Sequence, residues 1–107
     1  MVSELTVQQF LQRRAAGARL TLLDVREEWE LRLAPAPSEY LHIPMGQIPA
    51  RMQEMDLGAD IVVMCRSGQR SMEVARFLER AGFTKVANLQ GGILAWSRDI
   101  DPSIPVY

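Results

Sequence analysis

The chemistry available to this chain of 107 residues centres on its only cysteine, Cys65. The segment IVVMCRSGQR, residues 61–70, is apolar up to Cys65 and then becomes polar, basic and glycine-containing. One cysteine cannot form an internal disulfide, and with a single histidine it falls short of the roughly four ligands of a structural zinc site. Arg66, Gly68 and Arg70 suit an anion-binding loop better than a core, so the sequence favours a nucleophilic thiolate over a buried, inert thiol.

Short apolar runs that alternate with helical patterns predict the framework that positions this loop. We expect strands over residues 20–25, 40–43, 61–64 and 86–89. We expect helices between Thr6 and Gly17 and over residues 26–33, 50–55, 71–81 and 93–98. This alternation is typical of an α/β fold with a parallel sheet covered on both faces, and the length predicts a single domain over residues 1–107.

The loop after Cys65 is expected to be the ligand-binding part of this framework. Cys65 follows a buried strand and precedes a helix, which places it at the carboxyl edge of the sheet, where ligands bind in such folds. Gly68 lets the backbone turn, so that several amides point inward together with the positive end of the helix. These are the amides of Ser67, Gly68, Gln69 and Arg70. Such a ring of donors stabilises an anion and makes a thiolate nucleophile without a histidine base.

Three motifs give the chain a resemblance to a known family. CRSGQRS, residues 65–71, resembles the active-site loop of single-domain rhodaneses, which are sulfurtransferases that carry sulfane sulfur as a cysteine persulfide. LLDVRE at 22–27 is similar to the family's strand ending in Asp-Val-Arg, and NLQGGILAW at 88–96 is similar to its closing Gly-Gly motif with tryptophan. The resemblance implies a rhodanese-like three-layer α/β/α fold with a central, mostly parallel sheet of five strands.

The resemblance also implies a two-step sulfur transfer that uses no cofactor and no metal. Cys65 is expected to attack the outer sulfur of a small anionic donor such as thiosulfate, or of a persulfide or polysulfide. A thiophilic acceptor, such as cyanide, a thiol or a protein, then removes that sulfur. Arg66 is expected to bind the anionic donor. Arg70 is expected either to contact the substrate or, as we favour, to tie the loop to a carboxylate.

Three further residues are expected to support the loop without reacting: Asp24, Arg26 and Ser71. The segment YLHIPMGQIPA, residues 40–50, departs from the family pattern because it lacks the glycines that usually flank His-Ile-Pro. We therefore expect His42 to be a structural side chain with a polar partner. Trp29 and Trp96 are expected to anchor the core, and four methionines are expected to pack there rather than form a recognition surface, namely Met45, Met52, Met55 and Met64.

Two alternative functions stay open at this point. Phosphatases of the same fold also use a cysteine in an anion-binding loop that ends in arginine, but their pattern has five residues between the two. Here four residues separate Cys65 from Arg70, which predicts a narrower ring than a tetrahedral phosphate needs. The second alternative is a non-catalytic binding module of this fold. Such modules commonly lack the cysteine, which this chain retains.

Composition limits the partners of the protein. Apolar residues make up 48% and charged residues 23% of the chain, and the formal net charge is −1. This balance has no basic excess of the kind that nucleic acids or anionic membranes attract. The N-terminal residues lack the apolar region of a signal peptide. We therefore expect a soluble, cytoplasmic protein that acts on small or protein-borne sulfur compounds.

Overall fold

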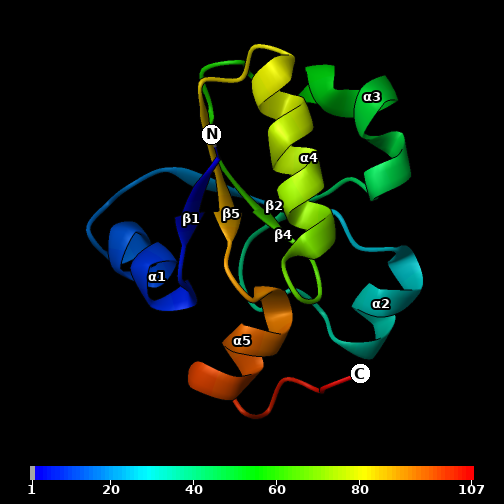
Figure 1. The fold of residues 1–107 in the computed structure, drawn as a ribbon. Helices are drawn as coiled ribbons and strands as arrows, with labels where there is room; N and C mark the ends of the chain where they lie inside the picture. Colours follow the sequence, from blue (N-terminus) through cyan, green and yellow to red (C-terminus); the bar gives the residue numbers. More distant parts are fainter. Residues whose placement is uncertain (1) are drawn as a thin grey trace.

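Five parallel strands form one central sheet in the computed structural model, which describes residues 2–107 (Figure 1). In spatial order the strands run β1-β5-β4-β2-β3. Their bounds are Ser3–Leu5 for β1, Leu20–Asp24 for β2, Leu41–His42 for β3, Asp60–Met64 for β4 and Lys85–Leu89 for β5. Every strand pair in the sheet is parallel. The predicted α/β fold with a five-stranded sheet is confirmed.

Helices cover both faces of the sheet and give the molecule three layers (Figure 1). Helices α1 and α5 pack on one face, and helices α3 and α4 pack on the other. The α-helices are α1 (Val7–Ala15), α2 (Glu28–Leu33), α3 (Ile48–Arg51), α4 (Gln69–Arg80) and α5 (Gly92–Asp99). Two short 3₁₀ helices, η1 (Met45–Gln47) and η2 (Met52–Glu54), flank α3.

Alternating burial along β2 and β4 explains how the layers are held together. Leu22 and Val62 belong to the apolar cluster under α1 and α5, whereas Leu23 and Val63 belong to the cluster under α3 and α4. All four side chains are at most 1% exposed. Strands buried on both faces form continuous apolar runs, which is the pattern that predicted them. Because β4 is the middle strand, the loop after it leaves the centre of the carboxyl edge.

The structure corrects one expectation about the core and locates the fifth strand. Trp29 does not anchor the core: it is 54% exposed, because α2 buries Glu30 and leaves Trp29 toward solvent. Trp96, at 3% exposure, packs in the core as predicted. The family resemblance implied a fifth strand, but the residue pattern did not locate β1, since it is a three-residue edge strand in which only Leu5 is buried. The helix expected over 50–55 corresponds to the end of α3 and to η2, and the helical segment begins earlier, at Met45 of η1.

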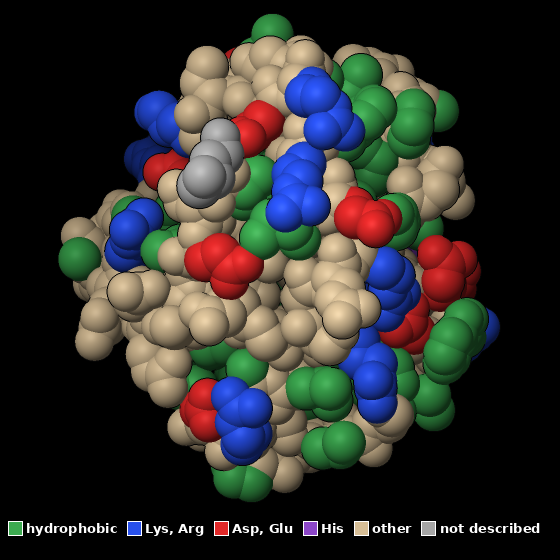
Figure 2. Space-filling model, in the orientation of Figure 1, with side chains coloured by type: hydrophobic (Ala, Val, Ile, Leu, Met, Phe, Trp, Pro, Cys, Tyr) green, Lys and Arg blue, Asp and Glu red, His purple; other side chains and the backbone are tan. Residues whose placement is uncertain are grey.

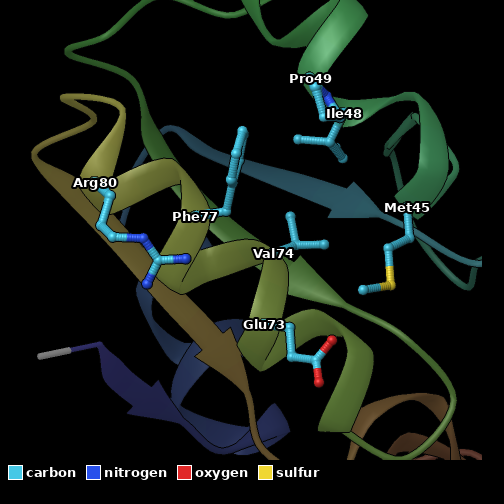
Figure 3. Close-up of a pocket in the computed structure, with 7 residues that line it drawn as sticks. All are labelled: Met45, Ile48, Pro49, Glu73, Val74, Phe77 and Arg80. Atoms are coloured by element: carbon cyan, nitrogen blue, oxygen red, sulfur yellow. The ribbon is translucent and has the colours of Figure 1, made fainter.

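The surface has two features of note. Figure 2 shows acidic and basic side chains interspersed over the face that it presents. A hollow of about 270 Å³ lies between α3 and α4, with Phe77 and Val74 at its apolar wall and Glu73 and Arg80 beside them (Figure 3). None of the residues that line this hollow belongs to the loop after Cys65. Across residues 2–107, no helix has both the length and the apolar character that crossing a membrane requires.

Candidate active site

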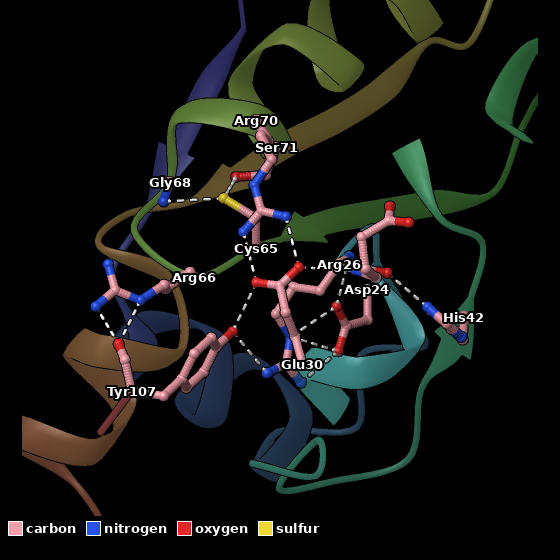
Figure 4. A network of polar contacts seen from close by, with 11 residues as sticks. Asp24, Arg26, Glu30, His42, Cys65, Arg66, Gly68, Arg70, Ser71 and Tyr107 are labelled. Carbon is pink, nitrogen blue, oxygen red and sulfur yellow. Dashed lines mark hydrogen bonds and ion pairs between the residues drawn. The ribbon is translucent and has the colours of Figure 1, made fainter. Parts of the chain in front are cut away.

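Cys65 follows β4 directly, and its side chain lies between the sheet and α4. The residue is 1% exposed, so its sulfur lies at the floor of the loop. The Gly68 N–H donates a hydrogen bond to Sγ at 3.1 Å, and Ser71 Oγ lies 3.2 Å from the same sulfur (Figure 4). Polar groups therefore contact the sulfur although apolar side chains surround the rest of the residue. The sulfur is thus within reach of a backbone hydrogen-bond donor at the floor of the loop.

The turn at Gly68 brings an N–H group to the sulfur. Gly68 has a φ of +100°, and a Cβ at this position would lie 3.2 Å from the Gly91 nitrogen. The expectation that a glycine is needed for this turn is confirmed. Within the part of the chain that the structure describes, the other amides expected in the ring, those of Ser67, Gln69 and Arg70, have no hydrogen-bond partner. Unpaired amides at the positive end of α4 favour an anion.

The N-terminus of α5 holds the same loop from outside. The Ile93 N–H donates to the Cys65 carbonyl at 3.0 Å, and the Leu94 N–H donates to the Arg66 carbonyl at 3.1 Å. The Gly-Gly motif permits this contact, because a Cβ on Gly92 would lie 2.4 Å from the Cys65 carbonyl oxygen. In a trans peptide the N–H points away from the C=O of the same group. Fixing these two carbonyls therefore also fixes the two amides that follow them.

Arg70 ties the loop to α2. Its guanidinium binds both carboxylate oxygens of Glu30, each at 2.7 Å. Glu30 is 2% exposed and also accepts hydrogen bonds from the Glu27 N–H at 2.8 Å and the Tyr107 hydroxyl at 2.9 Å. Burial would raise the pKa of Glu30, but the hydrogen bonds from Arg70, Glu27 and Tyr107 outweigh it and lower the pKa to about 2. The Arg70 side chain thus occupies the loop-fixing position that we favoured for it.

Replacing Glu30 by glutamine is expected to destabilise the fold in a pH-dependent way. A carboxyl whose pKa is lowered on folding, here from 4.5 to about 2, stabilises the folded state fully above the unfolded value. That contribution is lost as the pH falls from 4.5 toward 2. We expect Glu30→Gln to lower the free energy of unfolding at pH 7 by about 2–3 kcal/mol. The deficit should shrink in urea titrations repeated at decreasing pH.

Glu28→Gln is the matched control on the same helix. Glu28 pairs with Arg32 at 3.5 Å, but both side chains are at least 70% exposed, so the change should cost less than about 0.5 kcal/mol at any pH. A deficit for Glu30→Gln that stays constant between pH 7 and pH 3 would contradict the ion-pair account.

Asp24 and Arg26, expected to support the loop, are fully buried: Asp24 is the last residue of β2, and Arg26 follows two positions later. Arg26 donates Nε and Nη2 to the Asp24 carboxylate, with the shortest contact at 2.8 Å, and donates Nη1 to the Tyr107 hydroxyl at 3.1 Å. Burial would lower the pKa of Arg26, but the hydrogen bonds with Asp24 and Tyr107 raise it. Because the same hydroxyl donates to Glu30, a continuous chain of polar contacts connects Asp24 with Arg70 (Figure 4).

Arg66 lies on the outer side of the loop, against Tyr107. Its guanidinium donates two hydrogen bonds to the Tyr107 carbonyl, one of them from Nε at 2.6 Å, and its central carbon lies 5.3 Å from the centre of the Tyr107 ring. A hollow of about 460 Å³ adjoins these groups, and Trp29 and Leu33 contribute to its lining together with Arg70. The structure therefore places a cationic side chain and exposed apolar side chains together beside the loop.

His42 lies on β3, at the edge of this network of polar contacts (Figure 4). Its Nε2 is 2.7 Å from the Arg26 carbonyl oxygen, which gives it the polar partner expected of a structural histidine. Among residues 2–107, no three histidine, cysteine, aspartate or glutamate side chains are grouped so that they could hold a metal ion.

Three residues of the site were not predicted from the sequence: Glu30, Tyr107, and Asn88, whose side chain donates a hydrogen bond to the Gly68 carbonyl. Each is far along the chain from its partner, as the separation of 77 positions between Glu30 and Tyr107 illustrates. The expected carboxylate partner of Arg70 was a signal for Glu30, but the segment 26–33 also contains Glu27 and Glu28, and the sequence does not distinguish among them.

Comparisons with known proteins agree with the fold and show the family. The sequence profile of the rhodanese-like domain matches residues 6–99. A putative sulfurtransferase of Bacillus subtilis, YtwF, is 37% identical, with 94% of this chain and 96% of that protein covered. A sulfurtransferase of Allochromatium vinosum is 39% identical, with 92% and 91% covered.

A solved structure shows the same fold. The crystal structure of a rhodanese-like domain protein from Staphylococcus aureus superimposes with a TM-score of 0.82 over 99% of both chains, at 24% identity. With the profile match over residues 6–99 and two relatives above 30% identity, these findings establish that the chain belongs to the rhodanese-like domain family.

Proposed function

We propose that this protein is a sulfurtransferase that carries sulfane sulfur as a persulfide on Cys65. The observation that carries the proposal is the position of Cys65 Sγ, which accepts the Gly68 N–H at 3.1 Å inside a loop with further unpaired amides. These amides suit a second sulfur atom that bears negative charge. The names of the Bacillus subtilis and Allochromatium vinosum relatives, a putative sulfurtransferase and a sulfurtransferase, support the reaction class.

In the first half of the reaction, the Cys65 thiolate attacks the outer sulfur of thiosulfate. A new S–S bond forms to Cys65 while the S–S bond of thiosulfate breaks, and sulfite leaves with the bonding electron pair. The product carries its negative charge on the outer sulfur of the persulfide. Amide donors held in place before the reaction stabilise this charge without reorganisation.

In the second half, an external nucleophile attacks the outer sulfur and releases the Cys65 thiolate. Cyanide would leave as thiocyanate, and a thiol would leave as a new persulfide. Cys65 is the only cysteine of the chain, so no second thiol is available to release the sulfur as an internal disulfide. The cycle therefore needs an acceptor, either a small thiol or a protein.

Two features of the site support a small anionic donor. The 1% exposure of Cys65 favours a compound whose terminal sulfur projects without bulky substituents, such as thiosulfate, a polysulfide or a small persulfide. Arg66, beside the hollow of about 460 Å³, supplies a cation at the outer side of the loop. A guanidinium is suited to bind the oxygens of a sulfonate-like group.

Intact-protein mass spectrometry tests the proposal directly. After incubation with thiosulfate, polysulfide or a small persulfide, the protein is expected to gain the mass of one sulfur atom. Cyanide should then restore the original mass with the release of one equivalent of thiocyanate. An aryl phosphate serves as the comparison substrate. Hydrolysis of the aryl phosphate with no sulfur gain from any donor would overturn the proposal in favour of a phosphatase.

A further inference from the structure

We propose that Asn88 is a positioning residue that orients the amides of the Cys65 loop. Asn88 lies on β5, is 2% exposed and pairs in register with Val63 of β4. Its Nδ2 donates a hydrogen bond to the Gly68 carbonyl at 3.1 Å and makes a longer contact of 3.5 Å with Glu4. The inference rests on the proposed function, because the orientation of the loop matters for the sulfur that Cys65 would carry.

The hydrogen bond from Asn88 to the Gly68 carbonyl sets the direction of the next N–H group of the loop, because both belong to one planar peptide group. The Gly68 carbonyl and the Gln69 N–H belong to the same trans peptide and point in opposite directions. Asn88 holds the carbonyl from the β5 side, so it turns the Gln69 N–H away from β5. The same glycine supplies the N–H that contacts Cys65 Sγ at 3.1 Å. The Asn88 carboxamide thus constrains Gly68, whose N–H contacts the sulfur, and also the Gln69 amide that follows it.

The carboxamide is unusual because half of its hydrogen-bonding capacity is unused. Asn88 Oδ1 is buried and has no hydrogen-bond partner among the described residues. Leaving such an acceptor unpaired costs about 1–3 kcal/mol. The residues beside Asn88 on its own face of the sheet, Val86 on β5 and Val63 on β4, are buried and apolar. A leucine of nearly the same shape would suit this strand better, so the stability of the fold does not explain the asparagine.

Leucine at position 88 is therefore expected to separate stability from activity. Asn88→Leu removes the unpaired oxygen, and the Gly68 carbonyl keeps its bond from the Met72 N–H at 3.3 Å. The urea midpoint of unfolding should stay the same or rise. The rate of sulfur loading from thiosulfate should fall by about tenfold, which is less than the 10²–10³-fold loss on removing an oxyanion donor outright.

The experiment compares three proteins: wild type, Asn88→Leu and the control Glu4→Gln. The control keeps the hydrogen bond from Asn88 to the Gly68 carbonyl. Each is measured by urea unfolding, by the rate of sulfur loading and by the ¹H–¹⁵N amide shifts of Gly68 and Gln69. We expect displaced amide shifts and slower loading in Asn88→Leu alone, with amides at the distant Gly17 and Gly82 unmoved. Asn88→Ala provides the same comparison if the leucine variant does not fold.

Loading by Asn88→Leu at the wild-type rate, or a loss of loading that only follows a loss of stability, would overturn the inference. Failure of the proposed function gives a different result. In that case the wild type gains no sulfur from any donor. The amide shifts, together with the rate at which neutral iodoacetamide alkylates Cys65 in each variant, would then still decide whether Asn88 orients the loop.

Discussion

Replacing Cys65 by serine is expected to abolish sulfur loading and to lower the rate of thiocyanate formation by at least about 10³-fold. The serine oxygen has nearly the same position and can accept the same hydrogen bond from Gly68. It is, however, a much weaker nucleophile toward sulfur, and no stable carrier forms on it. Steady-state thiocyanate formation and intact mass measured on the same samples give the two readouts.

The serine variant keeps its fold for a structural reason. Cys65 is buried, and its sulfur contacts the polar groups of Gly68 and Ser71, which a hydroxyl can also satisfy. Wild-type protein alkylated at its single thiol serves as a chemical control, since it should lose activity to the same extent. Thiocyanate formation that survives in both samples would remove Cys65 from the mechanism.

The elements that position Cys65 were predictable because their signals are local. The apolar run before Cys65 forms β4, and Thr6, where a helix was expected to begin, caps α1 by accepting a hydrogen bond from the Gln9 N–H at 3.1 Å. The glycine at position 68 was predicted to turn the backbone, and it does so with a φ of +100°. Each of these features depends on residues that are a few positions apart in the sequence, so composition and spacing suffice to find them.

The residues that fix the loop were less predictable because their partners are distant in sequence. Arg70 and Glu30 are 40 residues apart, and Asn88 and Gly68 are 20 residues apart. Only the order of strands in the sheet brings these pairs together. The wrong expectation for Trp29 has the same origin, because its size indicated burial whereas the packing of α2 buries Glu30 and leaves Trp29 54% exposed.

The closest packing between the loop and its support occurs at Gly92. Its φ is +59°, in the left-handed region that side chains disfavour, and a Cβ would lie 2.4 Å from the Cys65 carbonyl oxygen and 2.5 Å from that of Arg66. Both contacts are with backbone atoms, which cannot move aside as a flexible side chain can. The same two carbonyls accept the N–H groups of Ile93 and Leu94, so a shift here would release the loop.

Gly92→Ala is therefore expected to lower the free energy of unfolding by about 3 kcal/mol or more, from backbone strain and from the displaced contacts. In a domain of this size that corresponds to a fall of about 10 °C or more in the thermal midpoint. Gly46→Ala is the control, because Gly46 is exposed and a Cβ there meets nothing within 4 Å. Thermal unfolding of both variants makes the comparison, and equal midpoints would show that α5 does not hold the loop as described.

Any Gly92→Ala protein that stays folded should also load sulfur more slowly than its stability alone predicts. The carbonyls of Cys65 and Arg66 are no longer fixed in this variant, so the amides that follow them are free to turn.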